Sequence, residues 1–148
     1  MNPTTVSPKE LAELQQAGSG IDLIDVRMPV EYRGVHVEFA RNIPLDQLDP
    51  TAVMQARNGS SDDPLYVVCR SGSRGEKACE QFQQAGFTNV INVDGGTLAC
   101  EKAGLPLVRG KKAISLERQV RIAAGSLVLL GAVLGWLIHP ALIGFSAF

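Results

Sequence analysis

The stretch LYVVCRSGSRG, residues 65–75, is an apolar run that leads directly into a loop of small and basic residues. The run is short and almost entirely apolar, which is typical of a parallel strand covered on both faces of its sheet. A helical pattern follows from Arg74 to Ala85 and ends before Gly86. This strand, loop and helix predict an α/β domain with a mostly parallel sheet.

Helices and strands alternate on both sides of this unit. The patterns predict helices over residues 8–17, 29–34, 50–56 and 97–103, and strands over residues 21–26 and 89–93. Ser7 and Glu10 have the spacing of a capping box, with a proline between them at the first helical position. Because the strands are separated by helices, their connections favour parallel pairing.

Cys69 is the candidate nucleophile, because it ends the buried strand and ligands bind beyond the carboxyl ends of such strands. The small residues of the following loop are Ser71, Gly72, Ser73 and Gly75. They let the backbone curl, so that successive amides form an anion nest at the start of the next helix. With Arg70 and Arg74 nearby, such a nest stabilises a thiolate and holds an anionic substrate against the sulfur.

The alternative for Cys69 is a small buried thiol with no chemical role, but a loop of glycine, serine and arginine is poor packing material. Cys79 and Cys100 lie on predicted helices, and we expect both to pack in the core. The sequence leaves open whether either acts as a resolving thiol. An odd number of cysteines favours a reducing compartment over a disulfide framework.

Four other residues receive supporting roles. We expect Asp25 to form an ion pair with Arg74, and Arg27 and Glu31 to fix the loop that follows the strand at residues 21–26. The two histidines, at positions 36 and 139, are far apart in the sequence and are interpreted as structural. The spacing of cysteines and histidines offers no metal ligand set, so neither a metal nor another cofactor is expected.

Three motifs, in order, resemble those of the rhodanese family of sulfurtransferases. They are DVR with EYRGVHVEFARNIPL (residues 25–27 and 31–45), CRSGSR (69–74) and GGTLACEKAGLPL (95–107). The resemblance covers residues 4–108 and implies a three-layer α/β fold. The chain departs from the family at Cys100, where tryptophan is common, and in the turn over residues 34–40, which is less glycine-rich than usual.

By this resemblance, Cys69 takes sulfane sulfur from thiosulfate or a persulfide and passes it to a thiol or cyanide. The cysteine would carry a persulfide between two half-reactions, held by residues 70–75, with Asp25 and Arg27 supporting the loop. A persulfide carrier or binding module is the first alternative. A cysteine phosphatase or arsenate reductase is the second, but phosphatase loops place five residues between cysteine and arginine, whereas here four intervene and the phosphatase arginine position falls on Gly75.

The net charge of −1 averages two unlike segments. Residues 1–108 hold nine basic and 14 acidic residues, a net charge of −5, whereas residues 109–148 have a net charge of +4. A hydrophobic content of 45% with 20% charged residues excludes a disordered, collagen-like or nucleic-acid-wrapping chain. We therefore divide the sequence into a catalytic domain (1–108), a basic linker (109–116) and a transmembrane segment (117–148).

The transmembrane interpretation rests on Ile122–Ile138, which is apolar on every helical face. As a helix this run would be about 26 Å long, close to the hydrocarbon thickness of a bilayer, with Trp136 placed as an interfacial anchor. Five basic residues precede it and predict that the catalytic domain faces the cytoplasm. This segment resembles the membrane part of bacterial inner-membrane rhodaneses, which implies an inner-membrane location.

The end of the segment carries three further expectations. Gly131 and Gly135 have the spacing of a helix-dimer face, which would allow a homodimer. His139-Pro140 is expected to break the helix. The eight residues that follow would cover only about 12 Å as a helix, and we interpret them as part of a second span that is cut short.

Overall fold

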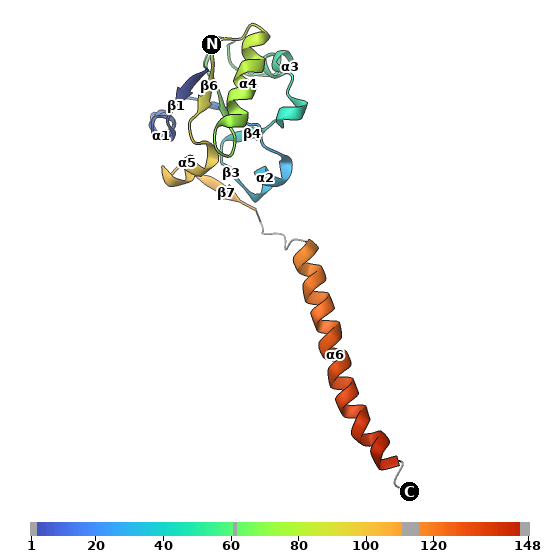
Figure 1. The fold of residues 1–148 in the computed structure, drawn as a ribbon. Coiled ribbons are helices and arrows are strands. Elements are labelled where there is room, and N and C mark those ends of the chain that lie inside the picture. Colours follow the sequence, from blue (N-terminus) through green and yellow to red (C-terminus); the bar gives the residue numbers. More distant parts are fainter. Residues whose placement is uncertain (1–2, 61, 111–115, 146–148) are drawn as a thin grey trace. The chain divides into compact units, whose positions relative to one another are not determined.

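A computed structural model of the 148-residue chain describes residues 3–60, 62–110 and 116–145, with side chains except at 116–117 and 139–145. Its contacts divide the chain into two compact units, Met1–Lys111 and Lys112–Phe148. Figure 1 shows the first as an α/β domain and the second as one long helix.

The first unit is built on a five-stranded parallel sheet in the order β1-β6-β5-β2-β4. Its strands are β1 (Thr4–Val6), β2 (Asp22–Asp25), β4 (Ala40–Asn42), β5 (Leu65–Val68) and β6 (Val90–Val93). Two further strands, β3 (Val35–Val37) and β7 (Leu107–Arg109), pair antiparallel in a small separate ribbon. The central position of β5 places whatever follows it in the middle of one sheet edge.

Helices cover both faces of the sheet. The helices of this unit are α1 (Pro8–Gln16), α2 (Pro29–Gly34), α3 (Pro50–Gln55), α4 (Ser73–Gln84) and α5 (Gly96–Lys102), with a 3-10 turn at Leu45–Gln47. One core cluster packs α3 and α4 on one face, and a second packs α1 and α5 on the other. Alternate residues of β5 point into the two clusters, as the buried apolar run predicts. The three-layer α/β fold is therefore confirmed.

The longer elements begin and end close to the predicted positions. The capping box is present, since the Ser7 hydroxyl accepts from the Glu10 amide at 3.2 Å and the Glu10 carboxylate accepts from the Ser7 amide at 2.9 Å. The sequence patterns did not reveal β1, β3, β4 and β7. Each has only three residues, too few for an alternating pattern to be visible.

The second unit contains α6 (Leu116–Phe145), and the predicted break at His139-Pro140 is wrong. A proline lacks only its own amide donor, and α6 continues through Pro140 to Phe145. Within α6, Arg118–Ile138 spans 21 residues with a mean hydropathy of 1.9 and has no buried residue. It is the one helix of the described residues that is long and apolar enough to cross a membrane.

Candidate active site

Cys69 directly follows β5, at the carboxyl edge of the sheet and between the ends of β6 and β2. Its side chain is 1% exposed. The Gly72 amide donates a hydrogen bond to Cys69 Sγ at 3.0 Å. The loop thus turns back on itself within three residues and directs a backbone donor at the sulfur.

Gly72 makes this turn with a φ of +112°, which side-chain-bearing residues rarely adopt. Its amide is directed at the Cys69 sulfur, and its carbonyl accepts from the amide of Glu76 at 3.0 Å and from the side-chain amide of Asn92 at 3.2 Å. Both polar groups of this glycine are therefore fixed. The sequence pattern indicated the glycine but gave no sign of Asn92, which lies on β6.

The amino end of α4 faces the thiol, because Gly72 is the N-cap residue of this helix. No side chain of the described residues caps this end. The partial positive charge of a helix amino terminus favours an anion there. A thiolate on Cys69, or an anionic sulfur attached to it, would therefore be stabilised by the Gly72 amide and by α4.

The loop rests on the amino end of α5. Thr97 donates twice to the Cys69 carbonyl, from its amide at 2.7 Å and from its hydroxyl at 3.1 Å, and the Leu98 amide donates to the Arg70 carbonyl at 3.3 Å. Gly96 has a φ of +62°, and a Cβ built on it would lie 2.4 Å from the Cys69 carbonyl oxygen. Glycine is thus required at position 96. The motif over residues 95–107 was visible in the sequence, but this supporting role was not.

Arg74 forms its ion pair with Glu31 of α2 instead of with Asp25, which corrects the sequence-based expectation. Its two terminal nitrogens donate to the two Glu31 carboxylate oxygens at 2.7 and 2.9 Å. This pairing lowers the pKa of Glu31 to about 2. Glu31 also accepts from the Met28 amide at 3.1 Å, so it joins the start of α2 to the first turn of α4.

Asp25 is paired with Arg27, and this explains why it is unavailable to Arg74. Arg27 lies two residues further along and donates to both Asp25 carboxylate oxygens, at distances from 2.6 to 3.1 Å. Both side chains are buried. Arg27 also donates to the Val35 carbonyl at 2.7 Å, which fixes the segment between β2 and β3. Arg27 therefore supports the neighbouring loop, as expected, and Asp25 supports Arg27.

The other residues of the loop differ in exposure. Arg70, Ser71 and Ser73 are exposed, whereas Gly75 is buried against Asn92. Arg70 forms no ion pair with any of the described residues. Its guanidinium is therefore available to an anion that approaches the loop from solvent.

The two remaining thiols lie in the core, as expected. Cys79, on α4, packs in the core cluster between the sheet and helices α3 and α4. Cys100, on α5, packs in the cluster on the other face of the sheet. Burial raises the pKa of Cys79 to about 12 and that of Cys100 to about 11. His36 stacks on Tyr32, with ring centroids 3.7 Å apart, and the side chain of His139 lies outside the described residues. Within the described ranges, no cluster of histidine, cysteine and carboxylate side chains could hold a metal ion.

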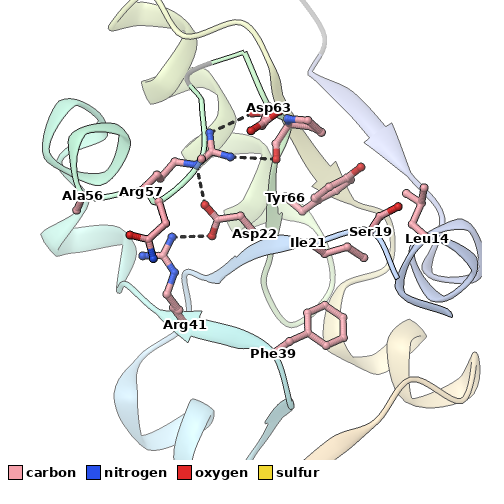
Figure 2. A pocket seen from close by; sticks show the side chains of 14 residues that line it. Leu14, Ser19, Ile21, Asp22, Phe39, Arg41, Ala56, Arg57, Asp63 and Tyr66 are labelled. Atoms are coloured by element: carbon pink, nitrogen blue, oxygen red, sulfur yellow. Dashed lines mark hydrogen bonds and ion pairs between the residues drawn. The ribbon is translucent and has the colours of Figure 1, made fainter. Parts of the chain in front are cut away.

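A hollow of about 730 Å³ lies at the opposite, amino edge of the sheet (Figure 2). Asp22, the first residue of β2, accepts from Arg41 and from Arg57 there, both at 2.6 Å. Arg57 is buried and also donates to the carbonyls of Asp63 and Pro64. Asp22, Arg41 and Arg57 thus bind one another, the Asp63 carboxylate accepts from the Ser60 amide, and Cys69 is at the other edge. The chemistry of a nucleophile and amide donors therefore places the candidate active site at Cys69.

Comparisons with known proteins agree with this fold. The family model of the rhodanese-like domain matches residues 7–103. A Synechocystis protein named "Uncharacterized protein slr1261" is 41% identical over 145 residues, which cover 97% of this chain and 78% of that protein. A protein of Allochromatium vinosum named "Sulfurtransferase" is 33% identical over 86 residues, 58% of this chain and 77% of that one.

Among solved structures, the rhodanese-like domain of the Anabaena Alr3790 protein matches with a TM-score of 0.64 and 21% identity. The match covers 78% of this chain and 86% of that domain. At this identity the likeness concerns the fold. The family model, the relatives and the fold lead to the same assignment, and the chain belongs to the family of rhodanese-like domains.

Proposed function

We propose that this protein is a sulfurtransferase that carries sulfane sulfur as a persulfide on Cys69. The observation that carries the proposal is the hydrogen bond of 3.0 Å from the Gly72 amide to Cys69 Sγ at the amino end of α4. An amide donor and a helix terminus stabilise an anionic sulfur without a cationic side chain in contact. The relative from Allochromatium vinosum, which is named a sulfurtransferase, supports the same reaction class.

The reaction divides into two displacements at sulfur. The Cys69 thiolate attacks the outer sulfur of thiosulfate, the new sulfur–sulfur bond forms, and sulfite leaves with the electron pair of the bond that breaks. Cyanide, or a thiolate acceptor, then attacks the outer sulfur of the persulfide and returns the Cys69 thiolate. No net oxidant or reductant is consumed, and the enzyme alternates between two covalent states, which predicts ping-pong kinetics.

Arg70 is the residue we expect to meet the donor anion. It is exposed at the mouth of the loop and forms no ion pair with the described residues. Arg74 is engaged with Glu31, so its role is to hold the first turn of α4 in place. Ser71 and Ser73 are exposed on the same loop and contribute hydroxyl donors on the solvent side.

The test is a thiosulfate-to-cyanide transfer assay on the wild-type chain, on Cys69→Ser and on the control Cys79→Ser. Wild type and Cys79→Ser are expected to produce thiocyanate, and intact mass should show one added sulfur atom after treatment with thiosulfate. Cys69→Ser is expected to show neither product nor adduct. Wild-type protein that gives no thiocyanate and no sulfur adduct would overturn the proposal.

The same assay separates a catalyst from a persulfide carrier. A carrier would accept sulfur on Cys69 and hold it, so intact mass would show the adduct while thiocyanate appeared only in stoichiometric amount. Repeated turnover would identify a catalyst. In both cases Cys69 accepts sulfur from thiosulfate. The catalyst and the carrier differ only in whether the sulfur then passes repeatedly to the acceptor.

A phosphatase is disfavoured by the surroundings of Gly75. Phosphatase loops place an arginine at this position, and here a Cβ on Gly75 would lie 2.1 Å from Asn92 Oδ1. A side chain at position 75 would have to displace Asn92 from beneath the loop. Hydrolysis of a phenyl phosphate by wild type, and its loss in Cys69→Ser, would contradict this reasoning.

For the second unit, we propose a membrane anchor that keeps the catalytic domain in the cytoplasm, at the inner membrane. The support is the apolar stretch Arg118–Ile138, with Leu127, Val128 and Trp136 each about three-quarters exposed. Basic residues precede it, which favours a cytoplasmic amino-terminal side. The homodimer expected through Gly131 and Gly135 stays a prediction.

The anchor is tested on membranes from cells that express the full chain. The wild-type chain should resist a carbonate wash, whereas Val128→Arg combined with Leu129→Arg should move it toward the soluble fraction, because charge at mid-bilayer is costly. Protease added to right-side-out vesicles should leave the catalytic domain intact, and protease added to inverted vesicles should digest it. Extraction of the wild type by carbonate would overturn the anchor, and the opposite digestion pattern would overturn its orientation.

A further inference from the structure

Asn92 is a buried amide in a position where the fold calls for an apolar side chain. It is 1% exposed and lies on β6, between Ile91 and Val93. These two neighbours belong to the core cluster that packs α1 and α5 against the sheet. By strand alternation its side chain points to the other face, toward α4, as that of Val90 does. It contacts Gly75 of α4 there. A polar residue in this layer needs an explanation other than packing.

Only one end of the Asn92 amide has a partner. Its side-chain nitrogen donates to the Gly72 carbonyl at 3.2 Å, but Oδ1 has no hydrogen-bond partner within the described part of the chain. A buried acceptor without a partner destabilises a fold. Leucine, which has nearly the same shape, would fill the space without this penalty. The stability of the domain therefore does not account for asparagine at this position.

Among the described residues, the one hydrogen bond of the Asn92 side chain goes to Gly72, the residue whose amide donates to the Cys69 sulfur. Gly72 donates its amide to Cys69 Sγ at 3.0 Å and has a φ of +112°. A glycine has more backbone freedom than any other residue, so its orientation depends on external contacts. The Asn92 amide and the first helical hydrogen bond of α4, from Glu76, hold its carbonyl.

We propose that Asn92 is a positioning residue of the sulfur-transfer site. It fixes the Gly72 carbonyl so that the amide of the same residue stays directed at Cys69 and at the persulfide that replaces the thiol. The role in catalysis rests on the proposed function. The geometric role, orientation of the donor toward Cys69, can be tested without sulfur transfer.

Gly75 is the second member of this arrangement. A Cβ on Gly75 would lie 2.1 Å from Asn92 Oδ1, so any side chain there must push the amide aside. The Asn92 amide can therefore occupy its place beneath the loop only because residue 75 has no side chain. Substitution at either position should disturb the same hydrogen bond to Gly72.

The principal test is Asn92→Leu in the full chain, with three measurements. Its unfolding midpoint should equal or exceed that of wild type, because the unpartnered acceptor is gone. Its kcat for thiosulfate-to-cyanide transfer should fall about tenfold with little change in KM for thiosulfate, as expected for a misplaced donor. Alkylation of Cys69 by iodoacetamide, followed by intact mass, should reach half its maximal rate at a higher pH than in wild type.

Asn42→Leu is the matched control. Asn42 lies at the end of β4, and its side-chain nitrogen donates to the backbone carbonyls of Asp25 and Arg27 at 3.0 and 2.9 Å. Within the described part of the chain, its side-chain hydrogen bonds go to Asp25 and Arg27 and not to residues 69–75. Its replacement should lower the unfolding midpoint and leave the pH profile of Cys69 alkylation unchanged.

A double-mutant cycle covers the case in which Asn92→Leu does not fold. Gly75→Ala and Asn92→Ala should each move the alkylation profile to higher pH. Gly75→Ala should add little in the Asn92→Ala background, because both changes break the same contact. Independent effects at the two positions would overturn the proposed coupling.

The outcomes also separate this inference from the proposed function. If wild type transfers no sulfur but the Asn92→Leu alkylation profile shifts, the proposed function fails and the positioning role stands. If wild type transfers sulfur and Asn92→Leu matches it in both kcat and alkylation profile, the positioning role fails. A loss of activity that merely follows the unfolded fraction would also overturn it.

Discussion

The guanidinium of Arg74 and the carboxylate of Glu31 meet in a two-fold hydrogen-bonded pair, at 2.7 and 2.9 Å. The pair joins the first turn of α4, which begins at the cysteine loop, to the first turn of α2. Helix α2 lies in the segment between β2 and β3. Both side chains are about one-third exposed or less. Planar, bidentate geometry of this kind holds two elements in a fixed orientation.

Glu31→Gln tests the contribution of this pair through its pH dependence. The pKa of Glu31 is lowered from 4.5 to about 2 by the Arg74 hydrogen bonds, so the folded state favours the ionised carboxylate. This contribution to stability is complete above pH 4.5 and disappears as the pH falls toward 2. In denaturant unfolding, the stability difference between wild type and Glu31→Gln should therefore be largest near neutral pH and shrink below pH 4.5.

Glu101→Gln is the control for this titration. Glu101 is paired with Arg109, but both side chains are well exposed, and exposed pairs contribute little. Its stability should match that of wild type across the same pH range. A Glu31→Gln variant that behaves like Glu101→Gln would contradict the structural role of the Arg74 pair.

Gly96→Ala should disable the cysteine loop. The new Cβ would lie 2.4 Å from the Cys69 carbonyl oxygen and 2.5 Å from the Arg70 carbonyl, on a residue with a φ of +62°. Overpacking and backbone strain together should cost at least about 3 kcal/mol in unfolding free energy. Urea unfolding and the sulfur-transfer assay measure the two effects.

Gly104→Ala isolates the backbone part of this cost. Its φ is +80°, but nothing lies within 4 Å of a Cβ built there. It should lose about 1 kcal/mol of stability and retain sulfur transfer. Equal losses of unfolding free energy in Gly96→Ala and Gly104→Ala would mean that the close approach of residue 96 to the cysteine loop does not contribute to the cost.

Arg27→Met should be among the most destabilising single changes in the domain. Arg27 and Asp25 are both almost fully buried, so removal of the arginine leaves an unpaired carboxylate in the core. The expected loss is about 3–5 kcal/mol in unfolding free energy. Adding Asp25→Leu should recover part of this loss in urea unfolding, because the buried charge is then removed as well. No recovery in the double variant would indicate that the loss comes from the Val35 hydrogen bond instead.

The three thiols should differ sharply in reactivity. The pKa of Cys79, about 12, and that of Cys100, about 11, keep both almost fully protonated at pH 8, whereas the sulfur of Cys69 accepts from the Gly72 amide, which favours its thiolate. Iodoacetamide at pH 8 should therefore modify Cys69 first, with the other two reacting only after denaturant is added. Peptide mass mapping at increasing times gives the order, and early modification of Cys79 would contradict the core packing described above.

The sequence predicts the elements with strong local patterns and misses those that depend on distant segments. The apolar run of β5, the capping box of α1 and the prolines that start α2 and α3 each record their structure within a few residues. Strands β3 and β7 are set by each other, across about 70 residues of chain, and neither has a pattern of its own. Tertiary context defines them.

The same distinction applies to the site. Cys69 and its glycine–serine loop could be identified because the residues are adjacent. The partner of Arg74 could not, because Asp25, which ends β2, and Glu31, in α2, are both acidic and only six residues apart. Only the structure shows that the Asp25 carboxylate already forms an ion pair with Arg27. Asn92 gave no signal, since a single asparagine between Ile91 and Val93 has no preferred interpretation.

The supports of the cysteine loop come from segments far from it in the chain: α2 supplies Glu31, β6 supplies Asn92, and α5 supplies Thr97. The full set of these contacts cannot form in a chain that is unfolded or that ends before α5. In a domain that folds as one cooperative unit, the Gly72 donor to Cys69 and the support of its loop form together. Only a chain long enough to include α5 can complete the surroundings that set Cys69 apart from the other two cysteines.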